Sequence, residues 1–535
     1  RPEPGDNLVR VGRLERSGDV STLRTQLGRD LLSTFEMDLI VVAPAGSDPA
    51  EGLLFATPSL FHRLYYAEQR TPATVASETK GARWSPFSVL VPTPAWAQAT
   101  GTPALQIQTL VDEGASLFFE ATFGGNGRTC GSCHPANNNL TIDPPFIATL
   151  PQSDPLFVAE NNPDLADLEN PVLMRRFGLI LENVDGFNNP GVMRGVPHAL
   201  ALPTSLGPGN NATGWSGDGA PCSPQPGCSG PGTIRDFATG AVTQHFPRTL
   251  ARVPGVDFIL PNDAQLDAME AFQLSLGRQS DLSLAAMTFK NPLVEQGKVD
   301  FITPTSLGGS CNACHENAGA TPNFGSPNNN PNFATGVEDF PHPADQLTPQ
   351  QPRPRDAGFG TTPNTTKGGF GNDAFNTPPL VEAADTPPFF HNNAIDRLED
   401  AVDFYNSTFF NDLQAPDRRI TLTSAQVNAI AAFLRVINAL ENIRSSGDAE
   451  HQAIVANNSA DARALLRFSN TEKDDAIKVL NEQRLHFNAV LRLRAARGLI
   501  LAAILARQPN VRNALINQAI AQENIARDLM VTVAP

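Results

Sequence analysis

The sequence carries two copies of one short motif, Cys-x-x-Cys-His, at residues 130–134 and 311–315. A cysteine pair with this spacing and a histidine directly after it is typical of covalent c-type haem attachment. On a short helical turn the two sulfurs reach one edge of the porphyrin, and the following histidine lies under the iron as its proximal ligand. The sequence therefore predicts two covalent haem c groups, with Cys130, Cys133 and His134 at haem 1 and Cys311, Cys314 and His315 at haem 2.

Zinc binding is the alternative use of the motif cysteines. It would have to bring ligands together from two distant motifs, and it would leave both histidines without a common role. The other two of the six cysteines, Cys222 and Cys228, lie in the segment APCSPQPGCSG, whose Pro and Gly residues predict a surface loop. In an oxidising compartment we expect them to form a disulfide across this loop, with a pair of free thiols as the alternative.

Composition restricts the class of protein. The chain has 535 residues, of which 41% are hydrophobic, so it can bury a core, and its net charge of −16 argues against the basic face that nucleic-acid binding needs. Its first residue is Arg1 and no apolar leader follows, which favours a mature periplasmic or secreted chain after signal-peptide removal. The longest apolar run, residues 499–506, is far shorter than the roughly 20 residues of a membrane span.

The elements that must position the motifs form an internal repeat. After each motif come a Pro-containing segment, an aromatic turn, a short helix and a capped amphipathic helix, with Asn262 or Asp263 as one N-cap and Thr423 or Ser424 as the other. We expect a mainly α, loop-rich fold of two tandem cytochrome c-like haem domains with N-terminal and C-terminal helical extensions. The expected boundaries are 1–105, 106–280, 281–440 and 441–535.

Residues 110–440 resemble the bacterial di-haem cytochrome c peroxidase and MauG superfamily. The resemblance rests on LVDEGASLFFEATFGGNGRTCGSCH at residues 110–134, on the second haem motif, and on the block TPPFFHNN…LEDAVDFY…FL. Rubber oxygenases of the RoxA type share the di-haem core and are a second relative. The resemblance implies that peroxide or dioxygen reacts at haem 1, that haem 2 is six-coordinate and passes electrons, and that a tryptophan between the haems, here Trp215, relays them.

The second ligand of haem 2 departs from the peroxidase pattern. Typical peroxidases place a methionine where this chain has Tyr405, and MauG enzymes resemble this chain in using a tyrosine. A phenolate lowers the iron potential relative to methionine. His486, on the added C-terminal helices, is the competing candidate. RoxA relatives are similar in that a C-terminal extension supplies a histidine as the haem ligand. His391 is a third candidate.

The residues expected at the open face of haem 1 also differ from the peroxidase pattern. Alignment with the family puts Phe237 at the place of a glutamine and Pro247 at the place of the glutamate that moves a proton during O–O cleavage. His245 could move the proton instead, or could bind the iron and close the site, and Gln244 could donate a hydrogen bond to bound oxygen. An apolar Phe237 is similar to the rubber oxygenase pocket. His198 is expected to be a buried core histidine.

Three functions follow from these expectations: a di-haem peroxidase, an oxygenase acting on an apolar polymer such as a polyisoprene, and a non-catalytic electron carrier. An electron-donor protein, a small cytochrome or a cupredoxin, would be the partner of the first. The resemblance also implies a Ca²⁺ ion between the domains, for which Asn376 and Thr377 are candidate ligands.

Overall fold

The computed structural model describes residues 15–17, 20–22, 39–42, 53–56, 104–205, 214–215, 233–320, 332–347, 353–358, 371–456 and 458–533. Contacts divide the chain into two units, residues 1–81 and 82–535. The described segments of the first unit are two antiparallel hairpins, β1 (Glu15–Ser17) with β2 (Val20–Thr22), and β3 (Leu39–Val42) with β4 (Leu53–Ala56). The helices expected there are wrong for these segments, because runs such as LIVV are rich in β-branched residues, which favour strands.

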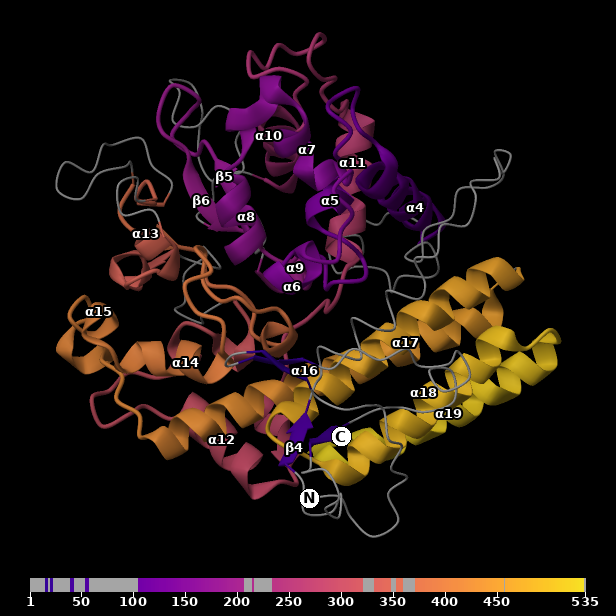
Figure 1. Cartoon of the computed structure of the whole chain (residues 1–535). Coiled ribbons are helices and arrows are strands. Elements are labelled where there is room, and N and C mark those ends of the chain that lie inside the picture. The colour runs from indigo at the N-terminus through magenta and orange to yellow at the C-terminus, as the bar shows by residue number, and fades with distance from the viewer. Residues whose placement is uncertain are drawn as a thin grey trace. The chain divides into compact units, whose positions relative to one another are not determined.

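In the second unit the described elements are mainly helices, as expected, and the few strands pair only into two-stranded antiparallel sheets. The first repeat consists of short helices and one hairpin between two longer helices (Figure 1). Its elements are α4 (Ala104–Glu120), α5 (Cys130–Cys133), α6 (Pro144–Ile147), η2 (Pro155–Phe157), α7 (Val158–Asn161), η3 (Pro163–Leu168), α8 (Pro171–Phe177), β5 (Leu179–Glu182), β6 (Val192–Gly195), α9 (Leu202–Ser205), α10 (Ile234–His245) and α11 (Asp263–Ser275).

The second repeat follows the same plan and continues into a long helix. Its elements are η4 (Leu284–Ala286), β7 (Met287–Phe289), α12 (Pro292–Ile302), η5 (Cys311–Ala313), η6 (Glu316–Ala318), β8 (Phe333–Ala334), η7 (Val337–Asp339), α13 (Pro343–Leu347), β9 (Ala374–Phe375), η8 (Ala383–Asp385), α14 (Leu398–Asp403), η9 (Phe404–Asn406), α15 (Thr408–Asn411), η10 (Pro416–Arg418) and α16 (Ser424–Val455).

In the first repeat, α4 crosses α11 at a glycine. A Cβ at Gly114 would lie 1.9 Å from the backbone oxygen of Ala268, so only glycine allows the helices to come this close. Four residues after each of these positions, the rings of Phe118 and Phe272 pack with their centroids 5.2 Å apart. The crossing lies just before the first Cys-x-x-Cys-His motif and holds the start and the end of the repeat together.

The crossing of α12 and α16 in the second repeat has the same construction. A Cβ at Gly297 would lie 1.9 Å from the backbone oxygen of Ala429. The rings of Phe301 and Phe433, again four residues later, have their centroids 5.4 Å apart. The internal repeat that the sequence indicates therefore extends to the packing of its longest helices.

The predicted helix caps are confirmed at Asn262 and Thr423. The side chain of Asn262 accepts a hydrogen bond from the backbone N–H of Gln265, and that of Thr423 accepts one from Gln426. In both cases the side-chain oxygen of the glutamine accepts a hydrogen bond from the backbone N–H of the cap residue, so each helix begins with a capping box.

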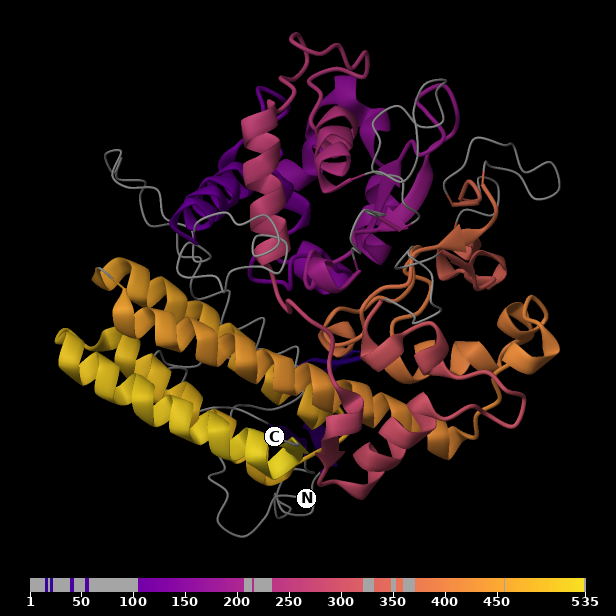
Figure 2. The ribbon, with the colours of Figure 1, turned by 180° about the vertical axis from the view of Figure 1, so that it is seen from behind.

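The C-terminal region is helical, as expected, but its boundary differs. The predicted boundary at residue 440 lies inside α16, which continues to Val455 and keeps burying side chains beyond residue 440, among them Ile443, Ser446 and Ala453. Three further helices follow: α17 (Ser459–Glu482), α18 (Phe487–Leu505) and α19 (Pro509–Met530). Figures 1 and 2 show these helices lying side by side with α16.

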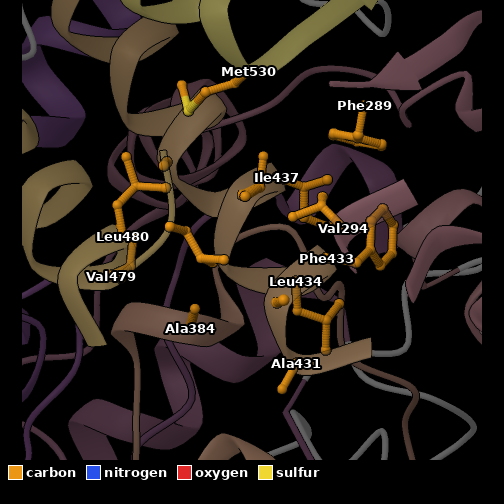
Figure 3. Close-up of a cluster of buried hydrophobic side chains, with 14 of the residues drawn as sticks. Phe289, Val294, Ala384, Ala431, Phe433, Leu434, Ile437, Val479, Leu480 and Met530 are labelled. Atoms are coloured by element: carbon orange, nitrogen blue, oxygen red, sulfur yellow. The ribbon is translucent and has the colours of Figure 1, made fainter. Parts of the chain in front are cut away.

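The largest hydrophobic core joins the second repeat to these helices (Figure 3). Phe289 and Phe433 from the repeat belong to the same buried cluster as Leu480 from α17 and Met530 from α19. The strand β10 (Val531–Val533), which follows α19, pairs with β7 directly before α12. The second repeat is thus built partly from residues at the far end of the sequence.

Candidate functional site

The first motif forms a single helical turn. Thr129 and Ser132 make a capping box at the start of α5, so the two cysteines lie on the short turn that the spacing predicts. His134 ends the turn, and its backbone N–H bonds to the carbonyl oxygen of Cys130 at 2.9 Å. Cys130 and Cys133 are both unlinked thiols. The pKa of Cys130 is raised to about 12 by burial, the opposite of the lowered pKa of a redox-active thiol.

The imidazole of His134 is oriented by one backbone carbonyl. Its Nδ1 lies 2.7 Å from the oxygen of Leu140, which assigns the proton to Nδ1 and leaves Nε2 as the atom with a free lone pair. Histidine ligands of metals are held in this way. Burial lowers the pKa of His134 to about 4, so the ring is neutral at pH 7.

The second motif reproduces this arrangement. The Nδ1 atom of His315 lies 2.9 Å from the carbonyl oxygen of Pro378, and burial again lowers its pKa to about 4. Cys311 and Cys314 are unlinked and lie on or beside the 3₁₀ turn η5. Both motifs therefore present two thiols and one oriented imidazole nitrogen, although they lie far apart in the sequence.

A cavity opens beside the first motif. It contains about 1160 Å³ of space that atoms do not fill, part of it open to solvent, and Cys130, Cys133 and His134 line one wall. Phe237 and His245 from α10 line it as well. Both cysteines and the histidine of the first motif therefore face one common space.

His245 has a buried carboxylate beside it that the sequence did not indicate. Its Nδ1 lies 3.6 Å from Oε1 of Glu169, slightly beyond hydrogen-bond distance. Glu169 is held by Arg128, whose Nη1 is 2.8 Å away, and by the backbone N–H of Leu181 at 2.8 Å. Burial opposes ionisation of Glu169, but Arg128 and His245 outweigh it and lower its pKa.

The sequence around Glu169 contains no motif that would predict its position beside His245. Arg128 adjoins the motif in sequence, but Glu169 follows it at a distance and comes close only through the turns between η2 and β5. Burial lowers the pKa of His245, although Glu169 acts in the opposite direction. The wall of the cavity therefore carries a neutral histidine, His245, which has the anionic Glu169 beside it.

Gln244 also lines this cavity, but its amide is engaged elsewhere. Its Nε2 donates to the carbonyl oxygen of Leu181 at 3.3 Å and to Oδ1 of Asn183 at 3.1 Å, and its Oε1 accepts from the backbone of Asn183. These contacts attach α10 to the end of β5. They favour a structural role for Gln244.

Tyr405 is the candidate second ligand that the structure places at the second motif. It is buried among Phe390, Phe404 and Phe410. Its pKa is raised, first by burial and then by the nearby motif cysteines 311 and 314. Its phenol is therefore close to the thiols that would hold haem 2.

The other two candidates have different surroundings. His391 stacks on Phe375 with ring centroids 3.6 Å apart, and its Nε2 lies 3.2 Å from Oε2 of Glu338. His486 precedes α18 in a left-handed conformation, and its ring bonds to the backbone of Leu529. The Nε2 atom of His486 is buried and has no hydrogen-bond partner in the part of the chain that the structure describes.

Trp215 lies where the two repeats meet. Its Nε1 donates to the carbonyl oxygen of Gly195 in the first repeat at 2.7 Å. Its own carbonyl oxygen accepts from the backbone N–H of Asn376 in the second repeat at 2.6 Å. Asn376 and the buried Thr377, the candidate calcium ligands, thus adjoin this tryptophan. Gly195 also bonds to the carbonyl of His391.

The remaining expected residues are placed as follows. His198 accepts a hydrogen bond from the backbone N–H of Leu200 at 3.3 Å, and burial lowers its pKa to about 4, in keeping with a core histidine. Cys222 and Cys228 lie outside the described residues.

Within residues that the structure describes, there is no group of three or more His, Cys, Asp or Glu side chains able to hold a metal ion. In the same residues, no helix has the length and apolarity needed to cross a membrane. A comparison with protein-family models finds no match for this chain, and a comparison with curated proteins finds none either.

Proposed function

We propose that this chain is a di-haem c-type oxidoreductase of the peroxidase kind, with haem 1 at the first motif and haem 2 at the second. The observation that carries the proposal is the matched pair of histidines: both follow a Cys-x-x-Cys turn, and both have Nδ1 fixed by a backbone carbonyl oxygen. A bound haem c would supply an iron that exchanges single electrons and, where one coordination position is open, reacts with peroxide or dioxygen.

At haem 1 the chain would provide proton handling and exclusion of water. His245 on the cavity wall would accept a proton from bound peroxide and return it to the departing oxygen, the role for which the family's glutamate is missing. Glu169 would stabilise the charged form of the imidazole, and Arg128 would hold Glu169 in place. Phe237 would keep the cavity wall apolar.

At haem 2 the chain would provide a ligand and a route for electrons. Tyr405 is the ligand that we favour, because the motif cysteines 314 and 311 act on the pKa of its phenol. Trp215 would carry electrons between the haems, since its side chain bonds to one repeat and its backbone to the other.

The first experiment counts covalent haem. Denatured protein should carry two haem groups by mass and by its absorbance in alkaline pyridine. The double variants C130S/C133S and C311S/C314S should each retain one, and the variant C130S/C133S/C311S/C314S none. Absence of covalent haem from a protein matured in a host that attaches haem c would overturn the proposal.

A second measurement distinguishes catalysis from electron carriage. In electron paramagnetic resonance, one high-spin and one low-spin haem would match an open haem 1 and a closed haem 2. Two low-spin haems, with His245 bound to iron, would identify an electron carrier. Reaction with peroxide and an electron donor then tests turnover directly.

An oxygenase is the second candidate, and the apolar wall of the cavity favours it. Phe187 and Val184 line the cavity together with Phe237, and the side chain of Phe187 is 42% exposed, so apolar surface continues toward solvent. A polyisoprene or another alkene polymer would be a suitable substrate. Oxygen uptake with such a polymer, in the absence of peroxide, would favour this function over the first.

A further inference from the structure

A second cavity lies where the first repeat meets η8 and the helices α16 and α17. It contains about 1050 Å³ of space not filled by atoms, part of it open to solvent. Apolar side chains form part of its wall, among them Leu140, Leu276 and Phe468. The rest of the wall carries the cation Arg444, neutral polar side chains and five acids: Glu382, Asp385, Glu441, Asp448 and Glu472.

The carboxylates of Glu382 and Asp385 are buried, and three of their four oxygens have no hydrogen-bond partner among the described residues. Glu382 is 3% exposed, and within the described part of the chain neither of its carboxylate oxygens accepts a hydrogen bond. Asp385 is 7% exposed; its Oδ2 accepts from Asn438 and Asn442 at 2.8 and 3.0 Å, whereas its Oδ1 has no partner there. The side-chain oxygen Oε1 of Gln279, on the same wall, also has no hydrogen-bond partner among the described residues.

The two arginines nearby are engaged with other acids, whereas Lys478 of α17 interacts with Asp475 and also with Asp385. Nη1 of Arg278 bonds to Glu441 at 2.8 Å, and Arg444 bonds to both Glu441 and Asp448 at 2.5 Å. The unpartnered atoms on the cavity wall, among described residues, are therefore all oxygen acceptors. Such a wall is complementary to an occupant that donates hydrogen bonds and carries positive charge.

The arrangement suits an organic cation better than a small metal ion. Calcium takes six to eight oxygen ligands, whereas Glu382 and Asp385 offer two carboxylates beside apolar side chains. A primary ammonium group donates three hydrogen bonds, and its alkyl chain packs on apolar surface. We propose that this cavity binds an aliphatic diamine or a related alkylammonium ion, with one ammonium group between Glu382 and Asp385.

Binding of such a cation displaces a proton. Burial, followed by repulsion from Glu441, raises the pKa of Glu382 to about 8, so this acid is largely protonated at pH 7 without the cation. An alkylammonium group, with a pKa of about 10.4, stays charged up to pH 8.5. The charged groups that face the pair are Arg278, Glu441 and Arg444 and, from α17, Glu472, Asp475 and Lys478.

Calorimetric titration of the complete protein with 1,4-diaminobutane tests the proposal. We expect one site, release of a proton at pH 7 (measured in two buffers of different ionisation enthalpy), and tighter binding at pH 8.5. Glu382→Gln should weaken binding at least about tenfold, since it removes a charged acceptor. The matched control Asp412→Asn, at an exposed aspartate after α15, should bind as the wild type does.

Three results would overturn the proposal: no heat of binding with millimolar diamine at either pH, equal affinity in E382Q and the wild type, or calcium binding that diamine does not displace. If E382Q does not fold, the wild-type protein decides the question. Binding without proton release, or binding that weakens between pH 7 and 8.5, would then contradict the assigned site.

Discussion

The histidine of each motif is held by a backbone carbonyl, that of Leu140 for His134 and that of Pro378 for His315. The histidines themselves could be predicted, because each directly follows a cysteine pair. The carbonyls could not, because the fold selects them. The same is true of Glu169, which reaches His245 only through tertiary structure.

Replacing Glu169 with Gln tests the proton-handling role of His245. We expect E169Q to keep both haems and to slow the reaction of haem 1 with peroxide at least about tenfold, since general acid–base groups typically contribute 10² or more. Stopped-flow absorbance measures this rate. The control is Glu160→Gln, at a glutamate that also pairs with an arginine, Arg175, away from the cavity wall. An E169Q rate equal to that of E160Q would contradict the role.

Replacing Tyr405 with Phe tests the ligand of haem 2. The substitution keeps the aromatic packing against Phe410 but removes the phenol oxygen. We expect the reduction potential of one haem to rise and its spectrum to change, because a phenolate donor is lost. Spectroelectrochemistry with His486→Ala and His391→Ala for comparison identifies the ligand. A shift in H486A with none in Y405F would assign the ligand to His486.

At the scale of elements, the two glycine crossings explain why the repeat can be seen in the sequence only in part. The capping boxes at Asn262 and Thr423 are local, and the sequence indicates them. The contacts of Gly114 and Gly297 are not local, because each glycine meets a helix well over a hundred residues later. The pattern of a glycine followed four residues later by phenylalanine is recognisable once the two crossings are compared.

Replacing Gly297 with Ala tests the crossing. The new Cβ would overlap the carbonyl oxygen of Ala429, so α12 and α16 must separate, and we expect a loss of more than about 2 kcal/mol in the free energy of unfolding. Gly498 in α18 is the matched control, since a Cβ there meets nothing within 4 Å. G498A should gain about 0.5–1 kcal/mol. Urea denaturation measures both, and equal stabilities would refute the close crossing.

At the scale of the whole molecule, burial of acidic groups makes stability depend on pH in an unusual direction. Burial, the largest cause in each case, raises the pKa of Glu450 to about 7 and that of Asp475 to about 8, as it does for Glu382. A sequence with net charge −16 signals excess acid, but it does not tell which carboxylates the fold removes from water.

These raised pKa values predict that stability falls with rising pH. A folded-state pKa above the unfolded value contributes stability that is complete below the unfolded value, near pH 4, and is lost as the pH rises to about 8. The buried histidines act in the opposite direction only below about pH 6.5. We therefore expect the free energy of unfolding to fall between pH 6.5 and 8. The free energy of unfolding of the double variant E382Q/D475N should fall less steeply over this range. A rise in the free energy of unfolding of the wild type would contradict the raised pKa values.

The pairing of β10 with β7 has a consequence for the order in which the molecule is completed. The core around Phe272 in the first repeat needs only residues between 111 and 276, whereas the largest core, which surrounds Phe433, includes Met530 and Val531. During synthesis, which proceeds from the N-terminus, this part of the first repeat can close early. The second must wait until residue 533 has been added, so its cysteines stay accessible to a maturation enzyme for longer than those of the first.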